Sequence, residues 1–143
     1  EKGIDFQKII DDSFFAKTYG QAKLHGRAVL DSVRILDNRC VYTVVTTDEL
    51  REYGCTVKAT DGIVDQLRII EGIEIAFLLY QTGNPDEYKV SLRTNSAVDV
   101  SRIAQSFGGG GHVKAAGCTM TGEPQEIVEK ISGKIREQWE ELK

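Results

Sequence analysis

The chain has 143 residues, of which 41% are hydrophobic and 28% charged, and its formal net charge is −4. This length and composition indicate one globular domain, and the acidic balance excludes a general polyanion-binding protein. No apolar run approaches the roughly 20 residues of a membrane span, so no membrane association is expected.

The first part of the chain is predicted to be helical. Apolar residues with flanking acids indicate a helix over residues 4–17, which Gly20 should interrupt. A second helix is predicted from Gln21 to Leu36, and it either docks on a partner domain or closes the core of its own domain. Its apolar face, inferred from heptad-like spacing, is predicted to comprise Ala22, Gly26, Val29, Val33 and Leu36.

The rest of the chain is predicted to alternate between strands and helices. Residues 39–47 are rich in β-branched side chains, and residues 73–81 are apolar enough for a strand buried on both faces. Residues 88–94 alternate between apolar and polar side chains, which indicates a strand with one polar face. Two helices are expected between the first two strands: a short one capped by Thr47 or Asp48, and one with Ile63, Leu67 and Ile70 on one side that ends at Gly72. After residue 94 we expect a helix from the capping Asp99 to Phe107 and a strand over 115–121. The last expected element is an amphipathic helix over 125–142, whose inward residues are Ile127, Ile131, Ile135, Trp139 and Leu142. We therefore predict a single α/β domain with a mixed β-sheet, covered by helices on at least one face.

The segment SFGGGGHVKAAG, residues 106–117, combines four glycines, a histidine and small side chains. Gly108 can end the preceding helix in a left-handed conformation, which leaves three glycines to explain. Without side chains, Gly109–Gly111 would expose backbone N–H groups to the oxygens of an anion, although an ordinary loop is the alternative. His112 could donate a hydrogen bond to the same ligand, or it could be a structural histidine.

A cationic strand precedes the glycines. The guanidinium of Arg93 can donate two parallel hydrogen bonds to a phosphate, and Ser91 on the same strand face could add a hydroxyl. A solvated surface arginine is the alternative. The local charge between residues 89 and 114 is +3, which fits a small anion site better than a long nucleic-acid groove. The residues that make up this charge are Lys89, Arg93, Asp99, Arg102 and Lys114. Apart from Arg93, the cations are interpreted as general surface charge.

The chain lacks the residues of a hydrolytic centre. Its two histidines, His25 and His112, are 87 positions apart without a cluster of acids near them, so no two-metal site is predicted. Neither a nucleophile elbow nor a catalytic triad is present, so we predict no catalytic and no metal-binding residue in this chain. Cys40, Cys55 and Cys118 are too widely spaced for a disulfide framework or a zinc ribbon, which favours a reduced, cytoplasmic protein.

Two segments, KVSLRT (89–94) and DVSRIAQSFGGGGHVKAAGCTM (99–120), resemble the DHH-associated C-terminal domain of the Asp-His-His phosphoesterases. Residues 61–81 look like the oligoribonuclease (nanoRNase)/pAp phosphatase branch of that family, so the resemblance covers roughly residues 20–140. The resemblance implies that the GGGGH loop contacts the nucleotide and that the strand before it grips the substrate phosphate. The residues that match these family positions are Ser91, Arg93, Thr94, Gly110, Gly111 and His112, with Thr94 standing where the family usually has serine.

The resemblance further implies a longer enzyme. In such enzymes an N-terminal domain carries the Asp-His-His motif and two manganese ions, and the C-terminal domain closes over the cleft and holds the substrate. Because that motif is absent, we expect the chain to be the C-terminal part of such a hydrolase and to be inactive alone. We divide it into a helical linker segment over residues 1–20 and the substrate-binding domain over residues 21–143. The expected partners are a short oligonucleotide or nucleotide phosphate, the N-terminal DHH domain of the same polypeptide, and a second copy in a homodimer.

Several alternatives remain open. A RecJ-type exonuclease or a cyclic-dinucleotide phosphodiesterase would use the same loop to bind nucleotide phosphate. A stand-alone nucleic-acid-binding module, like the related domain of alanyl-tRNA synthetases, would need neither a metal nor a second domain. A dimerisation domain that uses the N-terminal arm would leave the glycine–histidine loop unexplained.

Overall fold

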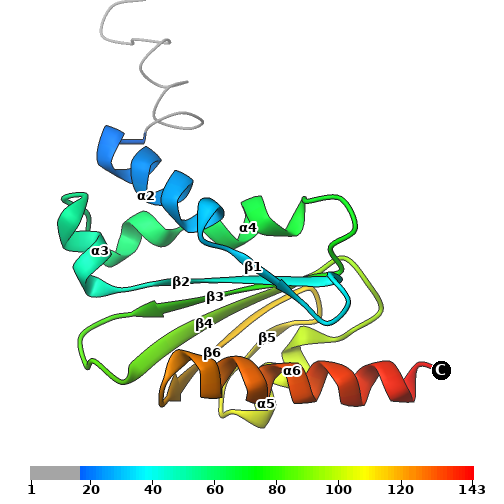
Figure 1. The fold of residues 1–143 in the computed structure, drawn as a ribbon. Helices are drawn as coiled ribbons and strands as arrows, with labels where there is room; N and C mark the ends of the chain where they lie inside the picture. Colours follow the sequence, from blue (N-terminus) through cyan, green and yellow to red (C-terminus); the bar gives the residue numbers. More distant parts are fainter. Residues whose placement is uncertain (1–16) are drawn as a thin grey trace, which may run out of the picture.

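A computed structural model describes residues 17–143, and Figure 1 shows its fold. The elements in chain order are α2 (Tyr19–Leu30), β1 (Val33–Ile35), β2 (Cys40–Val45), α3 (Thr47–Glu52), the 3₁₀-helix η2 (Val57–Thr60), α4 (Ile63–Arg68), β3 (Ile75–Gln81), β4 (Glu87–Thr94), α5 (Val100–Ser106), β5 (Gly110–His112), β6 (Ala115–Thr121) and α6 (Pro124–Glu141). The predicted helix over 4–17 and most of the linker segment 1–20 lie outside the described residues.

The six strands form one sheet in the order β1-β2-β3-β4-β6-β5. Within the described range, β2 and β3 pair in parallel and every other neighbouring pair is antiparallel. Helices α2, α3 and α4 lie on one face of the sheet and α5 and α6 on the other, as Figure 1 shows. The predicted α/β fold with a mixed sheet is therefore confirmed.

The first described helix, α2, is shorter than predicted. Thr18 caps it by accepting a hydrogen bond from the backbone N–H of Gln21, and the helix ends at Leu30 instead of Leu36. Residues 33–35 form an edge strand instead, because they pair with β2 in antiparallel orientation. A tight turn connects the two strands. Three consecutive residues of that turn have positive φ: Leu36, Asp37 and Asn38. The predicted helix face is consequently wrong, since the buried residues of α2 are Leu24, His25 and Ala28.

The helix caps agree in part with the sequence. Asp99 caps α5 as predicted, because its side chain accepts from the backbone N–H groups of Ser101 and Arg102. The N-cap of α3 is Thr46, which forms a capping box with Glu49, and not Thr47 or Asp48 as predicted. The 3₁₀-helix η2 was not predicted at all.

Two hydrophobic clusters lie on opposite faces of the sheet. One packs α5 and α6 against β3, β4 and β6, and the other packs α2 and α4 against β2 and β3. Strand β3 contributes to both, so its prediction as a strand buried on two faces is confirmed. Inward residues of α6 include Ile127, Ile131 and Ile135, as predicted, whereas Leu142 is 54% exposed. The prediction for Leu142 is wrong because this residue is the C-cap of α6 and lies beyond the last buried turn of the helix.

Across residues 17–143, no helix has both the length and the apolar character that a bilayer crossing requires. The three cysteines are free thiols, and burial raises the pKa of Cys40 to about 12 and that of Cys118 to about 11.

Candidate functional site

Among residues 17–143, helices cover the two faces of the sheet over only part of its width. On the side of α5 and α6, the inward-facing residues of β4 and β6 are buried. On the other side, α2 and α4 pack mainly on β2 and β3, and alternate residues of β6 and β5 stay half-buried or exposed. We call this uncovered area the open face, and it is formed by Ser91, Arg93, Gly110, His112, Ala115 and Gly117.

The register of the strands places the predicted site residues in two rows across the open face. Because directly paired residues of antiparallel strands point to the same side, each row presents its members together. At about 4.8 Å between neighbouring strands, the backbones of Arg93 and His112 are about 10 Å apart, which the arginine side chain and one phosphate can bridge. The two rows are Ser91–Gly117–Gly110 and Arg93–Ala115–His112.

The guanidinium of Arg93 is held in place before any ligand arrives. Its Nε donates to Oδ1 of Asp65 on α4 at 3.2 Å, and its Nη1 donates to the backbone carbonyl of Leu92 at 3.0 Å. The Arg93 side chain is 28% exposed, so it is neither a freely solvated arginine nor a buried one. Because Nε and Nη1 of Arg93 already have hydrogen-bond partners, the guanidinium is held in place. An anion can therefore bind its remaining N–H groups with little loss of side-chain entropy.

The glycines of the GGGG run have separate structural roles. Gly108 has φ +84° and follows α5 as predicted, but the next residues are an edge strand and not a loop. A Cβ on Gly109 would lie 2.1 Å from the carbonyl oxygen of Gly117, and one on Gly111 would lie 2.6 Å from Cα of Ala116. A Cβ on Gly110 would meet no atom within 4 Å. Close strand packing therefore accounts for two of the glycines, and Gly110 presents bare backbone to the open face.

Thr94 is separated from the other predicted residues. It points to the opposite face of β4 and is 4% exposed. Its hydroxyl lies 3.3 Å from the carbonyl oxygen of Glu74 and 3.1 Å from Oγ of Ser96. His112, in contrast, is exposed at the end of β5, and its Nδ1 lies 3.4 Å from the backbone nitrogen of Lys114. The structure thus brings together Ser91, Arg93, Gly110 and His112 but directs the Thr94 side chain away.

Two hollows accompany the open face, one beside Ser91 and the other beside Arg93. One of about 420 Å³ is lined by residues that include Tyr80, Lys89, Ser91, Gly109 and Gly117. The other, of about 460 Å³, is lined by Asp65, Arg68, Arg93, Thr94, Asn95, Lys114 and Ala115. Lys89 and Lys114 thus border hollows next to the predicted site residues, although their sequence context suggested general surface charge.

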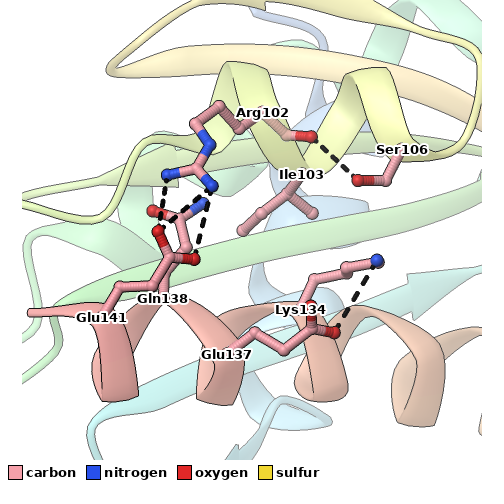
Figure 2. A pocket seen from close by; sticks show the side chains of 7 residues that line it. All are labelled: Arg102, Ile103, Ser106, Lys134, Glu137, Gln138 and Glu141. Atoms are coloured by element: carbon pink, nitrogen blue, oxygen red, sulfur yellow. Dashed lines mark hydrogen bonds and ion pairs between the residues drawn. The ribbon is translucent and has the colours of Figure 1, made fainter.

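Arg102 lies elsewhere. It projects from α5 on the opposite side of the sheet, where its guanidinium pairs with Glu141 of α6 at 3.3 Å. Figure 2 shows this pair at a small hollow of about 110 Å³ between α5 and α6, in which Lys134 also pairs with Glu137 at 3.7 Å. The interpretation of Arg102 as surface charge agrees with this position.

His25 is a structural residue within the second cluster. It is 4% exposed, its Nε2 donates to the carbonyl oxygen of Ala59 at 2.7 Å, and its Nδ1 accepts from Gln66 at 2.6 Å. Burial is the main cause of a lowered pKa for His25, and the hydrogen bond to Ala59 opposes it. The described part of the chain contains no group of three His, Cys, Asp or Glu side chains placed to hold a metal ion.

Sequence reasoning missed two residues of the site. Asp65 and Arg68 come from α4, 25 or more residues before Arg93, and no spacing or composition signal links them to the glycine run. Only the packing of α4 beside β4 brings them to the open face, where Oδ1 of Asp65 also accepts from Nε of Arg68 at 3.1 Å.

Comparison with known proteins decides the family. The sequence model of the DHHA1 domain matches residues 37–140. The chain belongs to the DHHA1 domain family. This DHHA1 domain is 31% identical over 96 residues to the bifunctional oligoribonuclease and PAP phosphatase NrnA of Thermus thermophilus, an alignment covering 66% of this chain and 29% of the relative. It is also 55% identical over 40 residues to the oligoribonuclease NrnB of Bacillus subtilis, covering 27% of this chain and 10% of that protein.

Solved structures share the fold of this DHHA1 domain. An exopolyphosphatase-related protein from Bacteroides fragilis superimposes with a TM-score of 0.82 at 22% identity, over 95% of this chain and 40% of that one. The pGpG-specific phosphodiesterase PggH from Vibrio cholerae superimposes with a TM-score of 0.55 at 16% identity, over 82% of this chain and 39% of that one. The alignments thus span less than half the length of these longer proteins. The predicted resemblance to the oligoribonuclease/pAp phosphatase members of the DHH family is confirmed.

Proposed function

We propose that this DHHA1 domain is the substrate-binding part of a DHH-family phosphoesterase that hydrolyses short oligoribonucleotides, pAp or both. The observation that carries the proposal is the strand register, which aligns Ser91 and Arg93 with Gly110 and His112 on one accessible face. A guanidinium, a hydroxyl, an imidazole and bare backbone are suitable groups for a phosphate ester. The choice of substrates is supported by the similarity to the Thermus NrnA, an oligoribonuclease and PAP phosphatase, and to the Bacillus oligoribonuclease NrnB.

The proposed role of the site is to hold and orient phosphate. Arg93 would donate from its free guanidinium edge, Ser91 and His112 would each add a hydrogen bond, and Gly110 would let the phosphate approach the strand. Donors fixed in advance stabilise the charge that redistributes over the phosphate oxygens in the transition state. None of these residues is proposed to act as a nucleophile or a general base.

The reaction itself is proposed to require the DHH domain of the same polypeptide, which would supply two manganese ions. The greater length of the relatives supports this division, because the alignment with the Thermus protein covers 29% of that protein. On this proposal the 143-residue chain binds substrate without hydrolysing it, and the cell compartment is the cytoplasm.

Ligand titration followed by amide NMR tests the binding role. Adding pAp or the dinucleotide pApA to the chain should shift the amide resonances of Ser91, Arg93 and Gly110–His112. We expect a dissociation constant of about 1 mM, because the chain would supply only half of a composite site. Arg93→Ala should abolish these shifts. Arg102→Ala removes the same charge from the opposite side of the sheet and should leave them unchanged.

Two outcomes would overturn the proposal. Shifts that spread evenly over the surface, or that survive Arg93→Ala, would mean that the open face does not bind phosphate specifically. A long RNA that binds far more tightly than pApA would instead favour the stand-alone nucleic-acid-binding module. The activity is tested separately on the polypeptide that includes the DHH domain, which should release mononucleotides in the presence of Mn²⁺ and lose this activity with Arg93→Ala.

A further inference from the structure

The hollow of about 460 Å³ beside Arg93 is lined by Arg93 and Ala115 of one row and by no residue of the row Ser91–Gly117–Gly110. Its lining comes from four separate segments: the helix α4, the end of β4 with the residue after it, the turn between β5 and β6, and the start of β6. The charged residues among these are Asp65, Arg68, Arg93 and Lys114. Three cations against one carboxylate leave a net charge of +2 around the hollow.

The carboxylate of Asp65 orders the two arginines. Its Oδ1 accepts from Nε of Arg93 at 3.2 Å and from Nε of Arg68 at 3.1 Å. The Nη1 groups are also engaged, that of Arg93 with the carbonyl oxygen of Leu92 and that of Arg68 with Oδ1 of Asn95 at 3.5 Å. Across residues 17–143, the Nη2 group of neither arginine has a hydrogen-bond partner. Asp65 thus fixes two guanidinium groups around one hollow while each keeps a donor free.

Lys114 connects this hollow to the glycine strand. It is the second residue of the two-residue turn between β5 and β6, and its Nζ donates to the carbonyl oxygen of Ser96 at 3.0 Å. The side chain is exposed at the rim, so its ammonium group retains donors for an incoming anion. A ligand in this hollow would therefore lie next to His112 and would share Arg93 with a phosphate held over Ser91.

We propose that this hollow binds a terminal phosphomonoester of the substrate, with Arg68, Arg93 and Lys114 as its ligands and Asp65 as the positioning residue. The inference rests on the proposed function, because it assigns a second phosphate to the same open face. A phosphomonoester carries a charge of about −1.5 to −2 at pH 7, whereas an internal phosphodiester carries a single negative charge. The net charge of +2 therefore matches a terminal phosphate better than a diester. This site selects substrates with a phosphorylated end, such as pAp and 5′-phosphorylated dinucleotides, over dinucleotides that lack one.

The test compares pApA with ApA, which differ by the terminal phosphate alone. In titrations of the chain, pApA should bind about tenfold or more tightly than ApA, since hydrogen bonds between charged groups are the strong ones. The amide of Ala115 should respond to pApA and not to ApA, whereas the amides of Gly110 and Gly117 should respond to both. Lowering the pH from 7 to 5 should reduce the preference, because the dianion of the terminal phosphate takes up one proton near pH 6 and becomes a monoanion.

Substitution of Arg68 separates this site from the first. Arg68→Gln should remove the preference for pApA, so that the affinities of the variant for pApA and ApA lie within about twofold of each other. Arg102→Gln, which removes an arginine from the opposite side of the sheet, should leave both affinities unchanged. Unaltered amide dispersion in both variants confirms that they fold, as expected for side chains that are 41% and 56% exposed.

The outcomes distinguish this inference from the proposed function. Equal affinities for ApA and pApA, both lost with Arg93→Ala, would overturn the terminal-phosphate site and leave the proposed function standing. An equal loss for both ligands with Arg68→Gln would also overturn it, because Arg68 would then not be selective. If neither ligand bound, even to the polypeptide that includes the DHH domain, both proposals would fall.

Discussion

Alanine at three successive glycines should give three different results. Gly109→Ala and Gly111→Ala should destabilise the domain, whereas Gly110→Ala should leave its stability intact and impair ligand binding. The three positions lie in one short stretch of chain, yet the space around each differs. The loss of backbone flexibility that follows from replacing glycine would affect all three variants alike. Differences in stability among the variants would therefore reflect the space around each glycine.

The expected magnitudes follow from the contacts. At Gly109 the new Cβ would lie 2.1 Å from the carbonyl oxygen of Gly117 and 2.6 Å from Cβ of Cys118. Overpacking of this kind costs about 1–3 kcal/mol, and we expect the upper end because the nearest atom is backbone. Gly111→Ala combines a 2.6 Å contact with φ +145°, a strained conformation that costs about 1–3 kcal/mol in itself. Gly110→Ala meets no atom within 4 Å and should change stability by about 1 kcal/mol at most, in the stabilising direction.

Urea denaturation measures these changes. With a denaturant slope of about 2 kcal/mol/M, a loss of about 3 kcal/mol lowers the midpoint by about 1.5 M. The same proteins are then titrated with pAp, where Gly110→Ala should weaken binding about tenfold because its methyl group covers the backbone on the open face. Gly26, an exposed helical glycine with no atom within 4 Å of its potential Cβ, provides the matched control, and Gly26→Ala should alter neither property adversely.

Two results would refute the reasoning. A midpoint for Gly109→Ala within about 0.3 M of the unmodified chain would show that Gly109, just before β5, does not approach β6 as described, since the expected decrease in the midpoint is about five times larger. Undiminished pAp binding by Gly110→Ala would show that the ligand does not approach the strand at this residue, and the anion site would have to lie elsewhere on the open face.

Three further predictions concern the covered parts of the fold. Because burial lowers the pKa of His25 in the folded state, the unfolded chain binds the proton first, and the free energy of unfolding should fall as the pH drops below about 6.5; denaturation at pH 7.5 and 5.5 should show this slope, and His25→Gln should reduce it. Iodoacetamide at pH 8 should modify Cys55 well before Cys40 and Cys118, whose pKa values of about 12 and about 11 keep them as thiols; peptide mass spectrometry that found Cys40 modified first would contradict its burial. Ile135→Ala should cost about 2–5 kcal/mol because Ile135 is fully buried in the cluster under α6, and a loss below about 1 kcal/mol would argue against that packing.

The parts of the fold that the sequence predicted are those fixed by local patterns. Alternation in β4 correctly placed Ser91 and Arg93 on one face, and Asp99 correctly marked the start of α5. The helix over residues 21–36 was overextended because apolar residues of β1 happened to continue the spacing of α2. Hydrogen bonding to β2 decided that segment, and such pairing is not visible in a local pattern.

The candidate site shows the same limit. The glycine run was predicted as a segment that exposes its N–H groups to an anion, or as an ordinary loop, whereas residues 110–112 pair with β6 and form a strand. Thr94 was grouped with Arg93 because it matches a position of the family motif, although adjacent strand residues point to opposite faces. Asp65 and Arg68 were not predicted because they belong to the site only through the packing of α4 against the sheet.

The short outer strands of the sheet also bear on the solubility of the domain. The outermost strands, β1 and β5, have three residues each, so each sheet edge offers few unpaired backbone groups to another chain. Edge-to-edge association of sheets is a common route to aggregation, and short edge strands are one way in which proteins prevent it. Glycine at two of the three positions of β5 lowers its β-propensity further. The segment proposed to admit phosphate to its backbone therefore also makes this edge a poor template for fibril growth.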